Sequence, residues 1–381
     1  MSIPSLLGAK DGLNYRILLQ GHYEAERLPK DFSSERIVPD FAFNVLNPLG
    51  LLYRPVVDED YLASGGAKPV WPNGKPFAVC LTHDVDMVSG CSFQESSRVR
   101  YASLLENSSP LKKIRSLVGW GLDDARAIKR GAAPDPLHCY ERWLEVEEKF
   151  GARSTFFFWP GWKAVGKHHP SDCLYDMEDR VTFDRQQCTV AEMIREIDRR
   201  GWEIGLHPSW YSFDNVDEMK RQKETLESVL GHDIVSVRQH YLHYDIRCTP
   251  RIQDAAGFKY DATLGFNDNI GFRFGTCYPW HLYDLKSETD LKIVEVPLII
   301  QDGALFHPDK GMRLDEEMAS EYLDVVTKNV KQVGGVLTLL WHPHAILHAH
   351  WWNFYKFAIE YLRGQSAWFG SVRKVVENFY L

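Results

Sequence analysis

Residues 77–86 read FAVCLTHDVD, an apolar run that ends among three ionisable side chains. The apolar residues are continuous rather than alternating, which is typical of a strand buried on both faces of a parallel sheet. Six later runs share this character and predict six further strands. They are 153–159 (RSTFFFW), 203–207 (EIGLH), 235–241 (VSVRQHY), 258–263 (FKYDAT), 292–300 (KIVEVPLII) and 335–342 (GVLTLLWH).

Helical patterns lie between these runs. Thr189 and Glu192 have the spacing of a capping box, and Gly231 is a typical residue to end a helix. Strands that alternate with helices predict an α/β fold with a parallel sheet, and seven strands fit either a closed barrel or an open doubly wound sheet. The predicted helices cover 137–150, 189–200, 216–230, 250–256 and 316–333, and the aromatic stretch 350–381 is expected to form packed terminal helices.

Residues 1–72 differ from the rest because they mix short apolar pieces with prolines. They end in the turn-rich sequence WPNGKP at 71–76, so we expect an N-terminal extension packed on a domain that spans 73–381. The long connection 88–136 is expected to be an insertion, since connections of this length in compact domains often cover functional sites.

Composition excludes several classes of protein. The 381 residues carry 44 Lys and Arg against 52 Asp and Glu, a net charge of −8, so a basic nucleic-acid-binding surface is not expected. No apolar run approaches the ~20 residues of a membrane span, and residues 1–10 lack the pattern of a signal peptide. The seven cysteines form no CxxC pair and are interpreted as reduced thiols, which predicts a cytoplasmic protein.

Ionisable residues at the strand ends predict a metal site. Asp84 and Asp86 would share one face of an extended chain and repel each other unless a cation or proton lies between them. One carboxylate can bind the ion while the other stays free as a base. His207 ends an apolar strand, and with Asp86 it supplies the imidazole and carboxylate ligands typical of zinc, iron or cobalt sites. The third ligand is left open among His240, Ser212 and His83.

Two other strand residues suggest acid–base chemistry. Arg238 lies inside an apolar strand, where a guanidinium group needs a carboxylate partner, and Asp84 is the natural candidate. His342 follows the apolar run 336–341, so it would be desolvated and rigidly held, as a general acid should be.

In the order and spacing of these residues, the stretch from about 75 to 345 resembles the polysaccharide deacetylase (NodB-homology) superfamily of metal-dependent carbohydrate de-N-acetylases. The resemblance implies a distorted (β/α)7 barrel. For the site it implies Asp84 as base, Asp86 and His207 as metal ligands, Arg238 as the residue that orients the base, His342 as general acid, and the backbone N–H of Tyr241 as an oxyanion donor.

The sequence departs from the family pattern in two places. The position four residues after His207 is Tyr211, where the family has its second metal histidine, and His240 replaces a proline that follows the motif arginine. We therefore predict that His240 supplies the lost ligand. The fourth motif of the family is not clear, and the candidates for substrate contact are Asp261, Arg273, Trp280, Trp210 and Tyr211.

The expected function is hydrolysis of an N-acetyl group from an amino sugar or glycan intermediate, with a divalent transition metal, zinc by preference, as cofactor. A cytoplasmic location favours a biosynthetic N-acetyl sugar as substrate. Two alternatives stay open: a cyclic amidase of the same superfamily, and a catalytically silent glycan-binding barrel.

Overall fold

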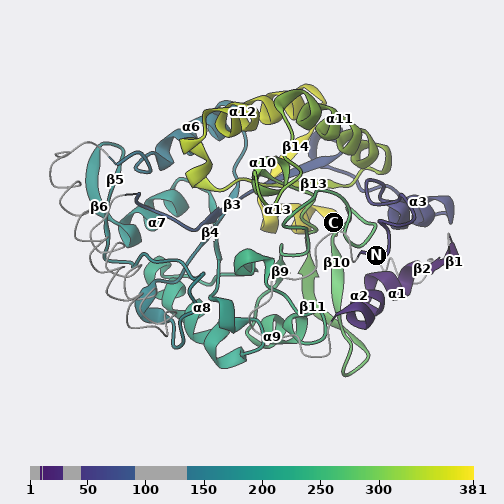
Figure 1. Cartoon of the computed structure of the whole chain (residues 1–381), viewed down its shortest axis with the longest axis horizontal. Coiled ribbons are helices and arrows are strands. Elements are labelled where there is room, and N and C mark those ends of the chain that lie inside the picture. The colour runs from purple at the N-terminus through teal and green to yellow at the C-terminus, as the bar shows by residue number, and fades with distance from the viewer. Residues whose placement is uncertain (1–8, 11, 29–43, 91–134) are drawn as a thin grey trace.

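The computed structural model describes residues 9–10, 12–28, 44–90 and 135–381. Almost all of the predicted insertion 88–136 lies outside these residues, as does Cys91. None of the described helices is long and apolar enough to cross a bilayer. Figure 1 shows a ring of strands surrounded by helices.

Each of the seven predicted runs contains a strand, and these strands are parallel to their neighbours in one sheet. The order across this sheet is β11-β9-β8-β7-β4-β3-β13-β12. The strands are β3 (Ala78–Val85), β4 (Thr155–Phe158), β7 (Glu203–Leu206), β8 (Ser236–Val237), β9 (Tyr260–Asp261), β11 (Thr289–Glu295), β12 (Ile300–Gln301) and β13 (Val336–Leu340).

Strands β11 and β12 are two parts of one extended stretch, and this stretch joins the two ends of the sheet. Beyond β11, the N–H of Val296 donates to the carbonyl of Asp261 over 2.8 Å, and just before β12, that of Ile299 donates to Thr338 over 3.2 Å. The stretch therefore pairs with β9 at its start and with β13 at its end. Seven strand positions arranged in this way form a distorted barrel, the option that the resemblance implied.

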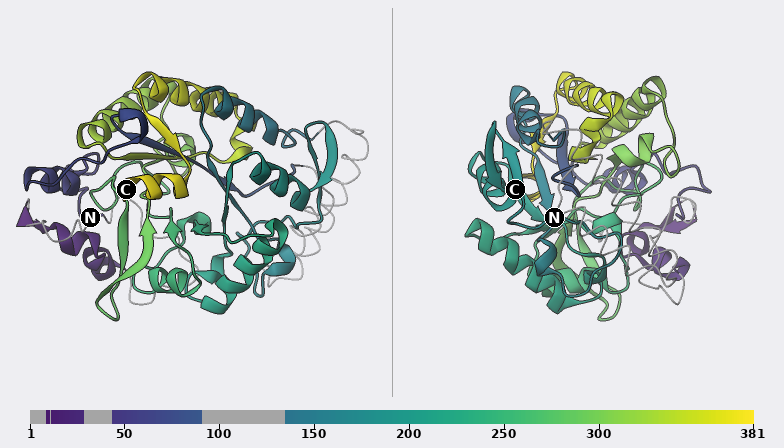
Figure 2. Two further views of the ribbon diagram at one scale, coloured as in Figure 1. Left: turned by 180° about the vertical axis from the view of Figure 1, so that it is seen from behind. Right: turned by 60° about the vertical axis from the view of Figure 1, so that its left-hand side comes forward.

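The predicted helices are also present and cover the outside of the strands (Figures 1 and 2). The Thr189 side chain accepts from the Glu192 N–H, and the Glu192 carboxylate accepts from the Thr189 N–H, so the predicted capping box is confirmed. The helices are α6 (Tyr140–Lys149), α7 (Val190–Arg199), α8 (Val216–Leu230), α9 (Thr249–Ala255), α11 (Glu316–Val333) and α12 (Ala349–Gly364).

Strand β3 alternates between the inside and the outside of the barrel. Ala78 and Cys80 belong to the apolar cluster of the interior, whereas Val79 and Leu81 belong to the cluster beneath the outer helices. Because side chains alternate along a strand, Asp84 continues the inner row, and His83 continues the outer row.

The C-terminal residues close the amino end of the barrel. β14 (Trp368–Gly370) pairs in parallel with Ala78–Cys80, on the same side of β3 that β4 occupies further along. α13 (Val372–Phe379) follows, and its Val372 and Val375 join the inner apolar cluster. The sequence indicated packed terminal helices here but not the added strand.

Shorter elements were not predicted. They are the hairpin β5 (Arg180–Phe183) and β6 (Gln186–Thr189), the strand β10 (Trp280–Asp284) antiparallel to β11, the helix α10 (Asp302–Phe306), and the 3-10 turns Pro72–Gly74, Trp162–Ala164, Trp210–Ser212, His240–Leu242 and Pro343–Leu347. Before the barrel lie β1 (Ala9–Lys10), β2 (Leu13–Asn14), α1 (Tyr15–Leu19), α2 (His22–Arg27) and α3 (Val56–Ala63).

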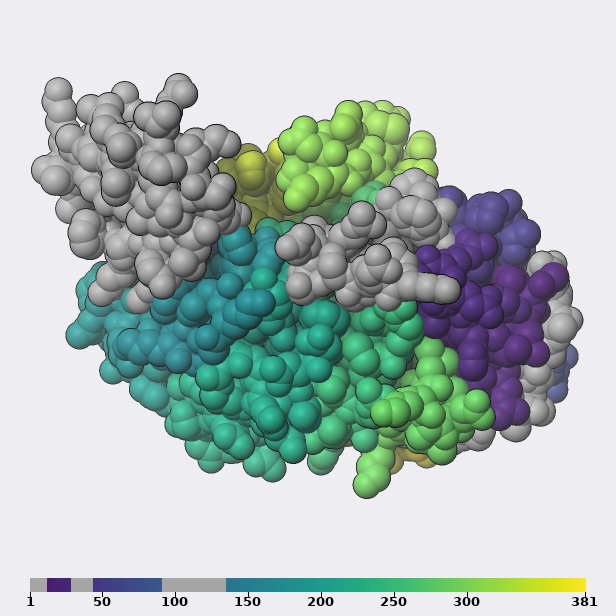
Figure 3. Space-filling model, turned by 60° about the horizontal axis from the view of Figure 1, so that its bottom comes forward, coloured from purple at the N-terminus to yellow at the C-terminus, as the bar shows by residue number. Residues whose placement is uncertain are grey.

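The described part of residues 1–72 packs against the segment that leads into β10. The carboxylate of Glu24 in α2 pairs with Arg273, with 2.9 Å between Oε2 and Nε. Trp280 Nε1 donates to the carbonyl of Leu19 over 3.2 Å. Figure 3 shows these N-terminal residues, in purple, lying against the green part of the barrel. Arg273 and Trp280 are therefore held by the N-terminal residues.

Candidate active site

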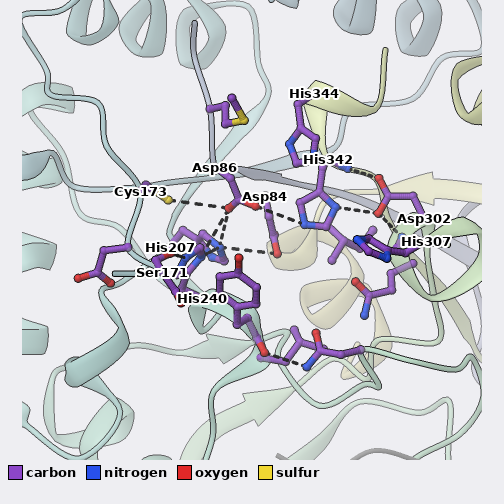
Figure 4. A pocket seen from close by; sticks show the side chains of 18 of the residues that line it. Asp84, Asp86, Ser171, Cys173, His207, His240, Asp302, His307, His342 and His344 are labelled. Carbon is purple, nitrogen blue, oxygen red and sulfur yellow. Dashed lines mark hydrogen bonds and ion pairs between the residues drawn. The ribbon is translucent and has the colours of Figure 1, made fainter. Parts of the chain in front are cut away.

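The carboxyl ends of the strands surround a cavity of about 510 Å³. The residues predicted from the strand ends meet there, although their elements are far apart in the chain (Figure 4). Those that line the cavity are Asp84 and Asp86 from β3 and its end, His207 after β7, His240 and Tyr241 after β8, and His342 after β13.

Asp86, His207 and His240 form a group that can hold a metal ion. One ligand atom from each lies within 4.8 Å of the others. The Oδ1 atom of Asp86 is 3.3 Å from His207 Nε2 and 3.5 Å from His240 Nδ1. His240 therefore lies beside Asp86 and His207, where the third ligand was predicted.

The hydrogen bonds of the two histidines leave two nitrogen lone pairs facing each other. His207 Nδ1 donates to the carbonyl of Arg238 over 2.7 Å, and His240 Nε2 donates to that of Ser171 over 2.6 Å. A neutral imidazole then has its lone pair on the other nitrogen, and these two nitrogens are 3.0 Å apart. Two lone pairs at this distance require a cation or a proton between them. The donor set therefore fits a metal.

The charge of Asp86 agrees with this interpretation. Burial by itself would raise the pKa of its carboxyl group, but hydrogen bonds to His207 and His240 and the nearby His342 hold the pKa well below its ordinary value. The carboxylate is therefore ionised and ready to act as a ligand.

The other two candidates for the third ligand lie elsewhere. His83 is on the outer face of β3, where its Nδ1 is 2.6 Å from the carbonyl of Trp341 and its Nε2 is 2.7 Å from the Glu147 carboxylate. Ser212 donates to the carbonyl of Ser209 over 2.6 Å. Both side chains are buried in other contacts, and neither belongs to the metal-binding group found among the described residues.

Arg238 holds Asp84 from inside the barrel. Its Nη1 lies 3.2 Å from Asp84 Oδ1 and 2.7 Å from Thr82 Oγ1, while its Nε donates to the carbonyl of Ala262 over 2.7 Å. The second oxygen of Asp84, Oδ2, is 3.9 Å from His207 Nε2. One oxygen of Asp84 is thus fixed by the guanidinium group, and the other faces the metal-binding group.

His342 is paired with Asp302, the first residue of α10. His342 Nδ1 is 2.7 Å from Asp302 Oδ1, and the His342 N–H donates to Oδ2 over 2.8 Å. Burial would lower the pKa of His342, but the charge of Asp302, its hydrogen bond, and the charges of Asp86 and Asp84 outweigh burial and raise the pKa to about 10. His342 is therefore protonated at neutral pH.

Asp302 was not predicted from the sequence, although its position at the end of an apolar run could have indicated it. Gln301 and Asp302 follow the apolar run 292–300 directly, as Asp84 and His342 follow theirs. The loop residues Ser171, Asp172 and Cys173 and the side chain of His344 also line the cavity. Their local sequence shows no strand-end pattern that would have indicated this.

Tyr241 has a backbone conformation that few residues adopt. Its φ is 56° and that of Leu242 is 52°, both in the left-handed region that is unfavourable for residues with a side chain. The Asn267 amide donates to the carbonyl of Tyr241 over 2.9 Å and supports this turn. Such conformations are concentrated at functional sites, and the Tyr241 side chain remains 40% exposed at the cavity.

None of the five side chains considered for substrate contact lines the cavity. Tyr211 lies beside Lys167, whose Nζ is 3.8 Å from the centre of the Tyr211 ring. Trp210 is stacked between His169 and His243, with ring centroids 4.3 and 4.0 Å away. Arg273 and Trp280 contact the N-terminal residues, as described above. Asp261 is fully buried beside Glu295, its partner in the pairing of β9 with β11.

The buried carboxyl groups of Asp261 and Glu295 predict how the stability of the fold depends on pH. Burial raises the pKa of Asp261 to about 6, and burial with the charge of Asp261 raises that of Glu295 well above its ordinary value. The folded chain then binds more protons than the unfolded chain above about pH 4, so stability falls as the pH rises through 6. Relative to the wild type, Glu295→Gln should therefore gain stability as the pH rises from 5 to 8, because it lacks one of the two carboxyl groups that lose a proton in this range.

Urea unfolding at both pH values measures this difference. The amide oxygen in Glu295→Gln can still accept from the Leu264 N–H, which donates to Glu295 Oε1 over 2.8 Å in the wild type. Glu224→Gln on the exposed face of α8 is the control and should show no such gain. An equal gain in both variants, or none in Glu295→Gln, would contradict the raised pKa values assigned to the pair.

Comparisons with known proteins show a shared fold. A scan against protein-family models finds no match, and no curated protein matches the sequence. A Mycobacterium smegmatis protein assigned as a polysaccharide deacetylase matches with a TM-score of 0.53 and 23% identity, over 82% of this chain and 94% of its own. Puue allantoinase matches with a TM-score of 0.51 and 15% identity, over 82% and 93%. A Pseudomonas aeruginosa PAO1 protein assigned as a polysaccharide deacetylase matches with a TM-score of 0.50 and 15% identity, over 82% and 94%.

Proposed function

We propose that this chain, a distorted barrel of the NodB-homology type, is a metal-dependent hydrolase that removes an N-acetyl group from an amino sugar or glycan intermediate. One observation carries the proposal. The lone pairs of His207 and His240 converge with Asp86 beside a carboxylate that Arg238 fixes. Simple binding of a glycan has no need of this arrangement.

The metal would be held by Asp86, His207 and His240. Two imidazoles and one carboxylate suit a divalent transition metal, zinc by preference, that keeps a position open for water. When bound, the metal lowers the pKa of a water ligand toward neutrality and polarises the amide carbonyl. The carbonyls of Arg238 and Ser171 fix the two rings in the required tautomers.

Asp84 acts as the base in this mechanism, and His342 acts as the acid. Asp84 Oδ2 accepts a proton from the attacking water while Arg238 holds Oδ1. The water oxygen bonds to the acetyl carbon, and we assign the Tyr241 N–H as the donor to the oxyanion that forms. His342 then gives its Nε2 proton to the nitrogen as the C–N bond breaks. Acetate and a free amine leave.

We place the protein in the cytoplasm, with a biosynthetic N-acetyl sugar as substrate. The supporting observation is chemical: the six cysteines of the described residues are all free thiols, and four of them are buried. Unpaired thiols are usual in a reducing compartment. We also propose that residues 1–72 form an extension of the barrel rather than an independent domain, since Glu24 and Leu19 bind Arg273 and Trp280.

A cyclic amidase is the second candidate function. It is favoured by the likeness to Puue allantoinase, since the same base and acid could open a cyclic amide. A substrate panel that contains N-acetyl amino sugars beside cyclic ureides and imides distinguishes the two functions by the product that is released.

Metal analysis tests the proposal. Protein purified without added metal should contain about one equivalent of a transition metal by elemental analysis, and His207→Ala and His240→Ala should both lose it. His232→Ala is the control, because His232 is half-exposed and pairs with Asp198. Absence of metal from the wild type even after reconstitution would leave a glycan-binding barrel as the better interpretation.

A further inference from the structure

The segment that follows α10 forms one wall of the cavity. His307 and Lys310 both line it. Figure 4 shows His307 beyond His342 and beside Asp302, on the side away from His207 and His240. If His342 protonates the leaving nitrogen, the sugar that carries this nitrogen lies on the same side. His307 and Lys310 therefore face the sugar and what is attached to it, not the acetyl group.

This wall is held in place by backbone hydrogen bonds. The His307 N–H donates to the carbonyl of Gly303, and the Gly311 N–H donates to that of His307, each over 3.0 Å. The Met312 N–H donates to Ala304 over 2.7 Å. The turn is thus anchored on both sides to α10, the helix that supplies Asp302, so its side chains start from a fixed backbone.

The ring of His307 is held with a free donor. Its Nδ1 accepts from the backbone N–H groups of Asp309 and Lys310, over 3.2 and 3.3 Å. Two N–H donors at this nitrogen require the proton to be on Nε2. His307 therefore offers an Nε2–H group.

Lys310 adds a positive charge that the described residues do not neutralise. Its side chain is exposed, and no carboxylate of the described chain lies within ion-pair distance of it. The carboxylates that line the cavity are occupied elsewhere: Asp84 by Arg238, Asp302 by His342, Asp86 by His207, and Asp172 by the N–H groups of His169 and Trp210. His307 and Lys310 thus offer donors on one wall of an acidic cavity, and an acceptor with negative charge fits them.

We propose that the substrate carries an anionic group, a phosphate or a carboxylate, attached to the sugar away from the acetamide and bound by His307 and Lys310. This inference rests on the proposed function, because the function decides which side of the cavity the sugar occupies. A charge-assisted contact of this kind adds affinity and weakens with salt. It selects a charged sugar intermediate over a neutral glycan.

Calorimetry with product-like ligands tests the proposal on metal-loaded full-length protein. The probes are glucosamine, glucosamine 1-phosphate, and the uronic acid of glucosamine. At low salt, one or both charged probes should bind about tenfold more tightly than glucosamine. Lys310→Met should remove this preference, Lys310→Arg should retain it, and Lys220→Met on α8 should leave it unchanged. The two charged probes distinguish a phosphate from a carboxylate.

The same binding experiment can also contradict the proposed anion site. The proposal is overturned if the wild type binds glucosamine as tightly as both charged probes, if it binds none of the three, or if Lys310→Met keeps the preference while remaining folded by circular dichroism. Because binding is measured without turnover, the proposed function can fail separately: a preserved anion preference with no amide hydrolysis of any substrate in the panel would contradict the hydrolase and not the anion site.

Discussion

Asp84→Asn is expected to lower kcat for acetate release by about 10³-fold. Asparagine keeps an oxygen for Arg238, whose Nη1 lies 3.2 Å from Asp84 Oδ1. The contacts of Arg238 inside the barrel should therefore persist. What asparagine cannot do is accept a proton from the attacking water. The measurement is steady-state kinetics on the best N-acetylated sugar of the panel, together with metal content.

Two properties that should stay unchanged in Asp84→Asn distinguish a base from a residue that supports the structure of the site. Metal content and the affinity for the amine product should stay near wild-type values in Asp84→Asn, because Asp84 is not among the three ligand residues. Asp172→Asn, at another buried carboxylate of the same cavity, is the control and should change kcat by less than about tenfold. Loss of metal from Asp84→Asn would instead assign this residue to the metal.

Asp302→Asn is expected to lower kcat by about 10²-fold and to change its pH profile. Asp302 is the main charge that raises the pKa of His342 to about 10, against the opposing effect of burial. Without this charge the pKa falls, so His342 loses its proton at a lower pH. The alkaline limb of the profile of kcat against pH should therefore move to lower pH.

A double variant tests whether Asp302 acts through His342. His342→Gln alone removes the acid, and adding Asp302→Asn to it should cost little more, since residues that act as a unit are not additive. Additive losses would show that Asp302 supports the fold rather than the histidine. An unchanged alkaline limb in Asp302→Asn would contradict the role assigned to His342.

The sequence was most informative where a strand is long and its side chains alternate. In β3 the alternation predicts that Asp84 shares a face with Thr82, and Arg238 joins them there because a buried guanidinium needs a carboxylate. The same alternation puts His83 on the other face, so one of the three candidates for the third ligand could have been excluded from the sequence.

Short strands allowed fewer predictions about which face a side chain occupies. Asp261 lies in a strand of two residues, which is too short for a pattern to show which face it occupies. Its neighbour Ala262 belongs to the inner cluster, so Asp261 turns outward to Glu295. His240 rather than Ser212 joins the metal-binding group next to a left-handed turn at Tyr241 and Leu242. Neither tyrosine nor leucine is a residue type that predicts such a turn. Arg273 pairs with Glu24, a contact between residues too distant in sequence to predict.

The added strand at the C-terminus has a consequence for how the site forms. β3 carries Asp84, yet its neighbours at the amino end are β13 and β14, which begin at Val336 and Trp368. During synthesis on the ribosome β3 stays incompletely paired until residues 336–370 have emerged. Pairing across so long a separation is slow, and a waiting apolar strand can associate with other chains. A truncation that removes β14 would therefore leave one edge of β3 unpaired and reduce the yield of folded protein.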